Sequence, residues 1–329
     1  MTKVLAPVRA TRVLDASQDA SIAEAARLLI EGGLVAMPTE TVYGLAADAT
    51  DERAVAALYA AKGRPQFNPL IAHVATLEAA AAEGGLNAQA WRLAERFWPG
   101  PLTLVVPVKP GRRVSLLARA GLRTLALRVP AHAIARGLIE AVGRPLVAPS
   151  ANRSGHVSGT RADHVLADLG GRIDAILDAG PCPLGVESTI VACLEDGARL
   201  LRPGALAREE IEACLGAHLS EGGPHGGAPI APGALASHYA PNARVRLNAQ
   251  TLRPGEAGLD FGGRFNAGGG ADVLDLSRTG DLTEAAANLF AHLRALDARA
   301  EAIAVAPVPR DGLGEAINDR LARAAADRG

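Results

Sequence analysis

Two segments of the sequence place hydroxyl, amide and carboxylate side chains directly after a short apolar run. Residues 37–44 are Met-Pro-Thr-Glu-Thr-Val-Tyr-Gly, and residues 148–155 are Ala-Pro-Ser-Ala-Asn-Arg-Ser-Gly. Ligands of open α/β sheets bind beyond the carboxyl ends of strands, and small side chains let backbone N–H groups approach a ligand closely. Both segments therefore predict parts of a pocket at strand ends. A capped turn, in which Thr39 or Thr41 bonds to the backbone, explains the first segment equally well.

Lys62 and Arg64 form a second feature. The segment 62–69 is Lys-Gly-Arg-Pro-Gln-Phe-Asn-Pro, so the two cations stand two residues apart, with Gly63 between them and Pro65 directly after Arg64. A rigid corner of this kind can bind phosphate or carboxylate. The alternative is a pair of cations that the dipole favours at the C-terminus of a helix. The two prolines favour the binding role.

Arg128 stands inside the apolar segment 124–130, Thr-Leu-Ala-Leu-Arg-Val-Pro. An arginine that points inward from a sheet needs an anion, because burying it unpaired is costly. Its alternation with Leu127 and Val129 also allows it to point outward. His73 lies in another apolar run and is, by itself, most simply a hydrogen-bonded core histidine. The segments 185–190, Gly-Val-Glu-Ser-Thr-Ile, and 201–204, Leu-Arg-Pro-Gly, add two hydroxyls and one more arginine.

Common motifs for nucleotides and metals are absent from the sequence. It contains neither GxxxxGK[ST] nor GxGxxG, so a P-loop or a dinucleotide fold has no direct support. It also lacks HExxH, paired CxxC and clustered carboxylates, so we predict no metal held by protein ligands. The three cysteines, Cys182, Cys193 and Cys214, cannot build a disulfide framework, which favours a reducing, cytoplasmic location.

The apolar and turn patterns predict the elements that position these segments. Apolar residues make up 49% of the 329 residues, enough for a buried core and for two domains. Strands and helices alternate, which indicates an α/β class with a mixed, twisted sheet and flanking helices. Ser21 and Glu24 have the spacing of a capping box, and Asp51 and Gly63 bound a second helix. Further strands are expected at 34–37, 70–74, 102–108, 124–129, 146–148, 173–177, 188–194 and 199–201, and helices at 88–97, 133–141, 162–169 and 207–214.

The chain divides into a domain at 1–218, a linker at 219–243 and a small α/β, Rossmann-like domain at 244–329. The linker is rich in glycine and proline. The last part predicts strands at 245–247, 273–276 and 303–305 and helices at 282–298 and 314–325. The richest apolar run, 102–108, has the length of a strand, so no membrane span is expected. The net charge of −1 gives no support to nucleic-acid binding by bulk charge.

The polar segments occur in an ordered series that resembles the YrdC/Sua5 family: PTETVYGL, KGRP followed by NPL, WPGPLTLV, LALRVP, APSANRSG, GVESTIV and LLRPGA. This resemblance covers about residues 15–215. Residues 231–241 resemble the linker of the longer, Sua5-type members, and 307–309 and 313–320 resemble their C-terminal domain. The linker departs from the family pattern, which has bulkier and more basic residues before His238 and Tyr239.

The resemblance implies synthesis of L-threonylcarbamoyladenylate. In that reaction L-threonine, bicarbonate and ATP give threonylcarbamoyl-AMP and pyrophosphate, the first step of the t6A modification of ANN-decoding tRNAs. Mg²⁺, held mainly by the ATP phosphates, is the implied cofactor. The product is expected to pass to the tRNA threonylcarbamoyl-transfer machinery, with at most a weak contact between this protein and tRNA.

The resemblance also implies roles for single residues. Lys62 and Arg64 are expected to be catalytic and to face the triphosphate and the carbamate, and Arg128 is the expected partner of the threonine carboxylate. Residues 228–241 are expected to close over the cleft on bound ATP. The threonine-binding set is Thr41, His73, Arg128, Ser150 and Ser188, and the ATP-binding set is Arg64, Asn68, Thr124, Asn152, Ser158 or Thr160, Arg202 and Tyr239.

Two other functions stay open at the level of sequence. A fold of this type could be an RNA-binding module without catalysis, but such a module does not need Ser, Thr and Asn at so many strand ends, whereas a small-molecule pocket does. A related core occurs in hydrogenase-maturation proteins that transfer carbamoyl groups. Those proteins carry zinc-finger-like and acylphosphatase segments that this sequence lacks.

Overall fold

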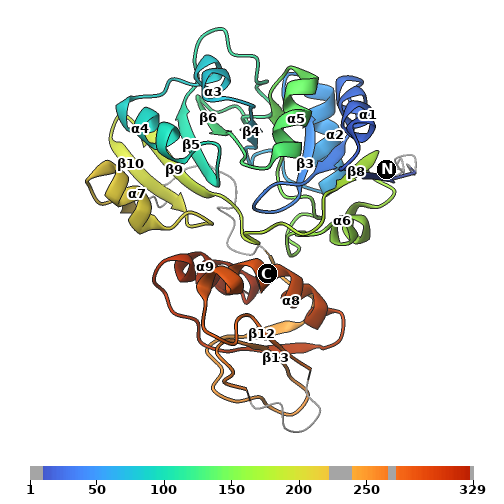
Figure 1. Cartoon of the computed structure of the whole chain (residues 1–329), viewed down its shortest axis with the longest axis vertical. Helices are drawn as coiled ribbons and strands as arrows, with labels where there is room; N and C mark the ends of the chain where they lie inside the picture. The colour runs from blue at the N-terminus through green and yellow to red at the C-terminus, as the bar shows by residue number, and fades with distance from the viewer. Residues whose placement is uncertain (1–9, 222–238, 266–271, 327–329) are drawn as a thin grey trace.

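The computed structural model describes residues 10–221, 239–265 and 272–326, which form two sheets (Figure 1). The large sheet has the strand order β1-β8-β2-β3-β7-β4-β6-β5-β9-β10-β11. Its strands are β1 (Arg12–Asp15), β2 (Val35–Met37), β3 (Gly44–Asp48), β4 (Ile71–His73), β5 (Leu102–Pro107), β6 (Thr124–Arg128), β7 (Leu146–Val147), β8 (Ala175–Asp178), β9 (Thr189–Leu194), β10 (Gly197–Arg202) and β11 (Ser220–Glu221).

Parallel and antiparallel pairs are mixed in this sheet. β4 runs parallel to β6, with His73 opposite Arg128, and antiparallel to β7, with Ala72 opposite Val147. Two elements distant in the sequence are thereby brought to either side of β4. This register places the chemistry-bearing side chains of β4 and β6 next to each other.

The helices that flank the large sheet within residues 10–221 are α1 (Asp19–Ile30), α2 (Glu52–Lys62), α3 (Leu77–Glu83), α4 (Ala88–Phe97), α5 (Ala133–Val142), α6 (Ala162–Leu169) and α7 (Arg208–Leu215). The alternating residues Leu125 and Leu127 of β6 point into the largest apolar core, together with Leu58 and Val55 of α2. α2 ends at Gly63, which takes a left-handed conformation with φ 62° that glycine adopts without strain. The main helical layer, α2, α3, α4, α6 and α7, covers one face of the large sheet, and α1 and α5 pack on the other face against β2, β3, β7 and β8.

The structure confirms the predicted mixed α/β fold and corrects some of its details. α1 begins at Asp19 after Gln18 and has no side-chain cap, so the predicted capping box is wrong. Ser21 is buried within the first turn, and Glu24 pairs with Arg12 of β1 instead of capping the helix. The sequence patterns do not predict β1, β3, β11 or α3, nor the strand Ala257–Asp260 (β13) of the C-terminal domain. The sequence of β3, Gly-Leu-Ala-Ala-Asp, has little of the β-branched or aromatic character that marks strands.

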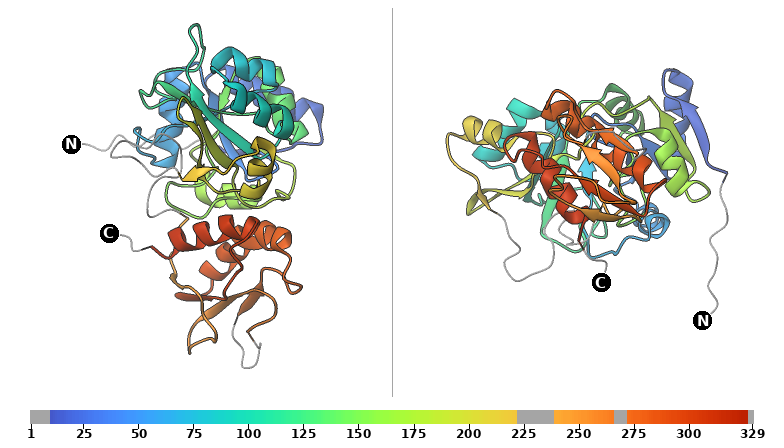
Figure 2. Two further views of the ribbon diagram at one scale, coloured as in Figure 1. Left: turned by 90° about the vertical axis from the view of Figure 1, so that its left-hand side faces the viewer. Right: turned by 90° about the horizontal axis from the view of Figure 1, so that it is seen from below.

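The C-terminal domain carries a parallel sheet in the order β12-β15-β13-β14, with β12 (Arg244–Arg246), β13 (Ala257–Asp260), β14 (Val273–Asp275) and β15 (Ala302–Val305). α8 (Leu282–Asp297) and α9 (Leu313–Ala324) lie between this sheet and the large domain (Figures 1 and 2). Asp281 caps α8 by accepting hydrogen bonds from the N–H groups of Thr283 and Glu284. The two helices therefore form the face by which the small domain meets the large one.

The junction of the two domains is a shared apolar core. Val42, Val157 and Val186 of the large domain belong to the same buried cluster as Leu289 and Phe290 of α8. Two ion pairs flank this core: Arg294 of α8 with Asp168 of α6 at 2.8 Å, and Arg208 of α7 with Glu315 of α9. The two domains are therefore packed together and not merely tethered.

Within the described parts of the chain, none of the helices combines the length and apolar character needed to cross a bilayer. Most of the predicted linker, 222–238, lies outside the described residues. His238 belongs to that part, and Tyr239 begins the next described stretch.

Candidate active site

A pocket opens on the face of the large sheet that the main helical layer leaves uncovered. Ile71 and His73 alternate along β4, and Arg128 lies opposite His73 on β6, so the three side chains share one face. Tyr239 closes the pocket from the side of the C-terminal domain. The full lining is Thr41, Val42, Arg64, Ile71, His73, Arg128, Ala148, Pro149, Ser150, Glu187, Ser188, Arg202 and Tyr239.

Both polar segments that the sequence predicts at strand ends line the pocket: Thr41 and Val42 follow β2, and Ala148, Pro149 and Ser150 follow β7. β7 runs antiparallel to β4, so the polar segment that follows β7 returns beside the start of β4, where the Ala148 N–H donates to the Ile71 carbonyl at 3.2 Å. The two segments therefore meet at this pocket.

Arg128 points inward and is paired with an anion, as an inward orientation requires. Its guanidinium donates to Glu40 Oε1 at 2.6 Å and to the Gly100 carbonyl at 3.3 Å. Burial alone would raise the pKa of Glu40, but Arg128 outweighs it and holds that pKa below its ordinary value. Glu40 Oε2 has no hydrogen-bond partner among the described residues. Burial and Arg128 together lower the pKa of the adjacent His73 to about 3, so His73 is neutral at pH 7.

Arg64 and Arg202 bring two further guanidiniums into the pocket, and both are buried. Arg64 donates to the Pro69 carbonyl at 3.1 Å, and Arg202 donates to the Ser188 carbonyl at 2.8 Å. Burial lowers the pKa of Arg64 to about 10 and lowers that of Arg202. Across the described residues, neither forms an ion pair with a carboxylate. These two guanidiniums leave the pocket with positive charge that an anionic ligand would neutralise.

Glu187 is the one carboxylate in the pocket lining. Its Oε1 accepts from the Ser158 hydroxyl at 2.6 Å, and its Oε2 accepts from Arg320 of α9 at 2.8 Å. Burial would raise the pKa of Glu187, but Arg320 and Arg202 outweigh burial and lower it to about 2. Next to it, the hydroxyls of Ser188 and Thr103 are 2.8 Å apart.

Lys62 is not among the residues that line the pocket. It ends α2, and its ammonium donates to the carbonyls of Ser150, at 2.5 Å, and Asn152. Burial and the nearby Arg64 lower its pKa. Lys62 therefore holds the backbone of the polar segment after β7 through two carbonyls, while Ser150 on the same segment lines the pocket.

Tyr239 is the first residue of the described C-terminal part, 239–243, of the predicted linker. Its side chain is buried, lines the pocket and stacks on Phe290 of α8 with ring centroids 5.5 Å apart. Its φ of 63° is a left-handed conformation that costs a non-glycine residue about 1–2 kcal/mol. The remaining residues expected to close over the cleft, 228–238, lie outside the described part.

The structure brings eight of the predicted site residues into one lining: Thr41, Arg64, His73, Arg128, Ser150, Ser188, Arg202 and Tyr239. Asn68, Asn152 and Ser158 are buried but are not part of this lining, and Ser158 bonds to Glu187 of the lining. The side-chain oxygens of both asparagines have no hydrogen-bond partner among the described residues. Thr160 lines a separate cavity between α6 and α8, and Thr124 lies half-buried at the start of β6.

Sequence reasoning missed Glu40 and Glu187. Both stand inside the quoted polar segments: Glu40 lies between Thr39 and Thr41, and Glu187 directly precedes Ser188. Their role shows only from their partners, Arg128 and Arg320, which are 88 and 133 residues away.

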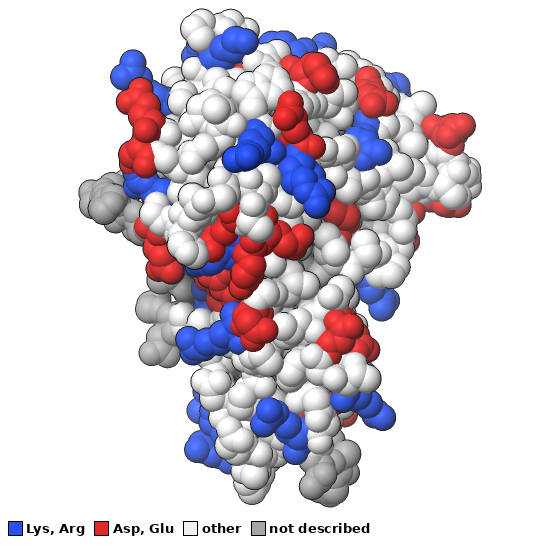
Figure 3. Space-filling model, turned by 60° about the vertical axis from the view of Figure 1, so that its left-hand side comes forward, with Lys and Arg blue, Asp and Glu red and all other residues white. Residues whose placement is uncertain are grey.

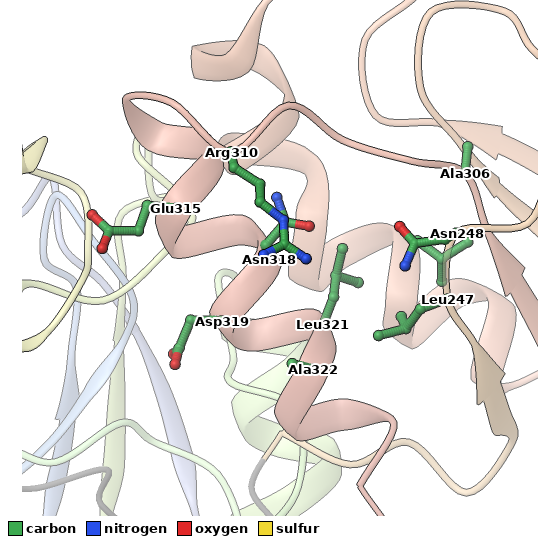
Figure 4. A pocket seen from close by; sticks show the side chains of 10 residues that line it. Leu247, Asn248, Ala306, Arg310, Glu315, Asn318, Asp319, Leu321 and Ala322 are labelled. Carbon is green, nitrogen blue, oxygen red and sulfur yellow. The ribbon is translucent and has the colours of Figure 1, made fainter. Parts of the chain in front are cut away.

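A second pocket lies wholly within the C-terminal domain (Figure 4). Leu247 and Asn248 follow β12, Ala306 follows β15, and Arg310, Asn318 and Asp319 approach from α9 and the segment before it. None of the predicted site residues lines it. We therefore place the candidate active site in the large domain.

Comparison with known families agrees with this placement. A family model for Sua5, YciO and YrdC proteins, described as "Telomere recombination", matches residues 27–204, and a model described as "Threonylcarbamoyl-AMP synthase, C-terminal domain" matches residues 206–326. The chain belongs to the Sua5/YciO/YrdC family. The two matches meet between β10 and α7, and every residue of the pocket except Tyr239 lies in the first.

Sua5-type relatives resemble the whole chain. Threonylcarbamoyl-AMP synthase of Bacillus subtilis is 42% identical over 95% of both chains, and that of Pyrococcus abyssi is 42% identical over 92% of this chain and 94% of the relative. The crystal structure of P. abyssi Sua5 complexed with L-threonine superposes with a TM-score of 0.87 at 39% identity, covering 96% of this chain and 98% of that one.

Proposed function

We propose that the protein is a threonylcarbamoyl-AMP synthase that converts L-threonine, bicarbonate and ATP into threonylcarbamoyl-AMP and pyrophosphate. The observation that carries this proposal is a pocket with three buried guanidiniums, of which only Arg128 is paired with a carboxylate of the described residues. Buried cations need anionic partners. A polyphosphate and an amino-acid carboxylate supply them, and relatives similar over the whole chain bear the name of this activity.

The chemistry requires two bond-forming steps. The threonine amine forms a C–N bond with bicarbonate carbon and water leaves, which gives a carbamate. A carbamate oxygen then forms a bond to the α-phosphorus of ATP, and the bond from that phosphorus to the pyrophosphate oxygen breaks. Positioning and charge neutralisation account for most of the catalysis in phosphoryl and nucleotidyl transfer.

The residues divide between the two substrates. Arg128 would hold the threonine carboxylate, with Thr41, Ser150, Ser188 and neutral His73 around the amine and hydroxyl. Arg64 and Arg202 would face the phosphates, where buried guanidiniums stabilise the charge that builds up during transfer. Tyr239 would cover the nucleotide, and Asn68 and Asn152 offer unpartnered amide oxygens nearby.

Mg²⁺ would enter as the ATP complex. Among the described residues there is no group of three or more His, Cys, Asp or Glu side chains that could hold a metal ion. Glu187, the carboxylate of the lining, already accepts from Ser158 and Arg320. The donors present fit an ion that the phosphate oxygens hold, since Mg²⁺ commonly keeps water and substrate phosphates as ligands.

The product would pass to the enzymes that transfer the threonylcarbamoyl group to tRNA. On the face shown in Figure 3, Lys and Arg alternate with Asp and Glu and form no continuous basic surface. This face therefore lacks the basic patch that an RNA-binding module needs.

The decisive experiment measures pyrophosphate release from ATP by the full chain. Release should require both L-threonine and bicarbonate, and L-serine should be a substrate roughly 10–200-fold poorer, since the missing methyl is worth about 1–3 kcal/mol in an apolar pocket. Equal release without threonine would disprove the proposal.

A further inference from the structure

Arg320 of α9 is the most deeply buried charged residue of the C-terminal domain, and it reaches the pocket of the other domain. Its side chain has 0% exposure. Its Nε donates to Glu187 Oε2 at 2.8 Å, and Nη2 donates to the Pro203 carbonyl at 3.0 Å. Both acceptors flank pocket residues, Ser188 and Arg202. The small domain therefore contacts the site through the forked guanidinium of Arg320, two of whose N–H groups bond to the Glu187 carboxylate and the Pro203 carbonyl.

The same guanidinium covers Tyr239. Its central carbon lies 5.2 Å from the centroid of the Tyr239 ring, a cation–π distance, and Phe290 stacks on this ring at 5.5 Å. A left-handed non-glycine residue persists only where its surroundings hold it. Two residues of the C-terminal domain, from α8 and α9, thus hold Tyr239 against the pocket.

The charge of Arg320 is itself held in place. Nη1 donates to Asp319 at 2.5 Å, and Asp319 also pairs with Arg323 at 3.0 Å. Burial alone would lower the pKa of Arg320, but the facing Tyr239, Glu187 and Asp319 raise it above its ordinary value. Arg320 stays a cation, and it offsets the charge of Glu187 beside the proposed phosphate site.

We propose that Arg320 is a positioning residue for nucleotide binding, by which the C-terminal domain sets Glu187 and Tyr239 at the pocket and so completes it. The proposal rests on the proposed function, since ATP is the nucleotide concerned. It assigns the C-terminal domain a part in the site without any direct contact between Arg320 and the substrate.

The test uses full-length Arg320→Lys and Arg320→Met with pyrophosphate release as the assay. Lysine keeps the charge but cannot bond to Glu187 and Pro203 in the geometry of the fork. We expect the KM for ATP to rise about tenfold in both variants, with the KM for threonine within about twofold of wild type. Arg208→Met is the matched control, because Arg208 also pairs across the domain junction, with Glu315, but does not line the pocket. It should leave the KM for ATP unchanged.

A second measurement covers the case in which Arg320→Met does not fold. In an Arg320→Lys background, Glu187→Gln should change the KM for ATP by less than it does in wild type, because the two residues act as one unit. An unchanged KM for ATP in Arg320→Lys, or fully additive effects with Glu187→Gln, would overturn the positioning role. An inactive wild type would instead contradict the proposed function, and calorimetric titration with ATP would then still compare Arg320→Lys with wild type.

Discussion

At the scale of single residues, two buried pairs of carboxylate and guanidinium organise the site. Glu40 with Arg128 lies on the proposed threonine side, and Glu187 with Arg320 lies on the proposed nucleotide side. Breaking such a pair leaves an uncompensated buried charge, which is more costly than removing both partners. For each pair, the effect of a substitution on the stability of the fold can therefore be separated from its effect on ligand binding.

Arg128→Ala should weaken threonine binding by roughly 2–4 kcal/mol, because the substrate carboxylate loses its charge-assisted partner. ATP affinity should change much less. The substitution also strands the Glu40 carboxylate, so the melting temperature should fall. Calorimetric titration of each ligand, with thermal unfolding, measures both effects.

The double variant Arg128→Ala with Glu40→Gln is the control for that result. It should recover part of the melting temperature, because no charge is left unpaired, and should not recover threonine binding. If Arg128→Ala abolished ATP binding but left threonine binding intact, the assignment of Arg128 to the threonine carboxylate would be contradicted.

The low pKa of Glu187, about 2 against an ordinary 4.5, makes a prediction about acid stability. The folded state holds this proton less tightly than the unfolded state, so the stabilisation is complete above about pH 4.5 and is lost as the pH falls towards 2. The difference in melting temperature between wild type and Glu187→Gln should therefore be constant near neutrality and shrink below about pH 4.5. A difference that stays constant down to about pH 3 would contradict the pairing with Arg320.

At the scale of elements, the segment after β7 is held from two sides, by β3 and by the end of α2. The Leu45 N–H of β3 donates to the Pro149 carbonyl at 2.7 Å. Lys62, the last residue of α2, donates to the carbonyls of Ser150 and Asn152, and the Ser154 N–H donates to the Lys62 carbonyl at 2.9 Å. One lysine thus supports the backbone of two residues that are expected on different substrates. The end of a helix sets the conformation of a loop that follows a distant strand.

Lys62→Met should lower the melting temperature and raise the KM for both ATP and threonine, since both sides of the segment lose their support. Steady-state kinetics with each substrate in turn measures this. A decrease in kcat with both KM values unchanged would contradict this supporting role. It would indicate that Lys62 leaves the carbonyls in the substrate complex and acts on the phosphates, as the family resemblance implies.

At the scale of the whole molecule, the active site depends on close packing between the domains. A Cβ added to Gly185 would lie 2.3 Å from the Ala286 carbonyl oxygen and 2.5 Å from Ala287 Cα of α8, and Gly185 has φ 71°. Backbone of the large domain thus touches backbone of the small one. Only glycine permits this approach, directly before the segment that carries Glu187.

Gly185→Ala should loosen the contact of α8 and raise the KM for ATP, with a drop in melting temperature larger than backbone strain explains. Gly216→Ala is the matched control, because Gly216 has φ 69° and nothing within 4 Å of an added Cβ. It should cost only the left-handed strain, about 1 kcal/mol. Equal effects of the two substitutions on stability and KM would show that the domain contact plays no part.

Local patterns in the sequence suffice to predict the α/β class, the order of most elements and the residue types of the pocket. These follow from local pattern: apolar runs mark strands, Gly63 and Asp51 bound a helix, and polar residues after strands mark the segments that face a ligand. An inward Arg128 also required an anion on general grounds, although the sequence left open both its orientation and the identity of that anion.

Only the tertiary structure decided how the parts meet. Strand direction in a mixed sheet is not encoded in any single strand, so the sequence does not show that the segment after β7 returns beside the start of β4. The arginine partners of Glu40 and Glu187 and the carbonyl partners of Lys62 lie 88 or more residues away, and no local periodicity carries such pairings. Arg320 lies in the helix predicted at 314–325, and its burial follows from the docking of two domains, a long-range event that no helix pattern encodes.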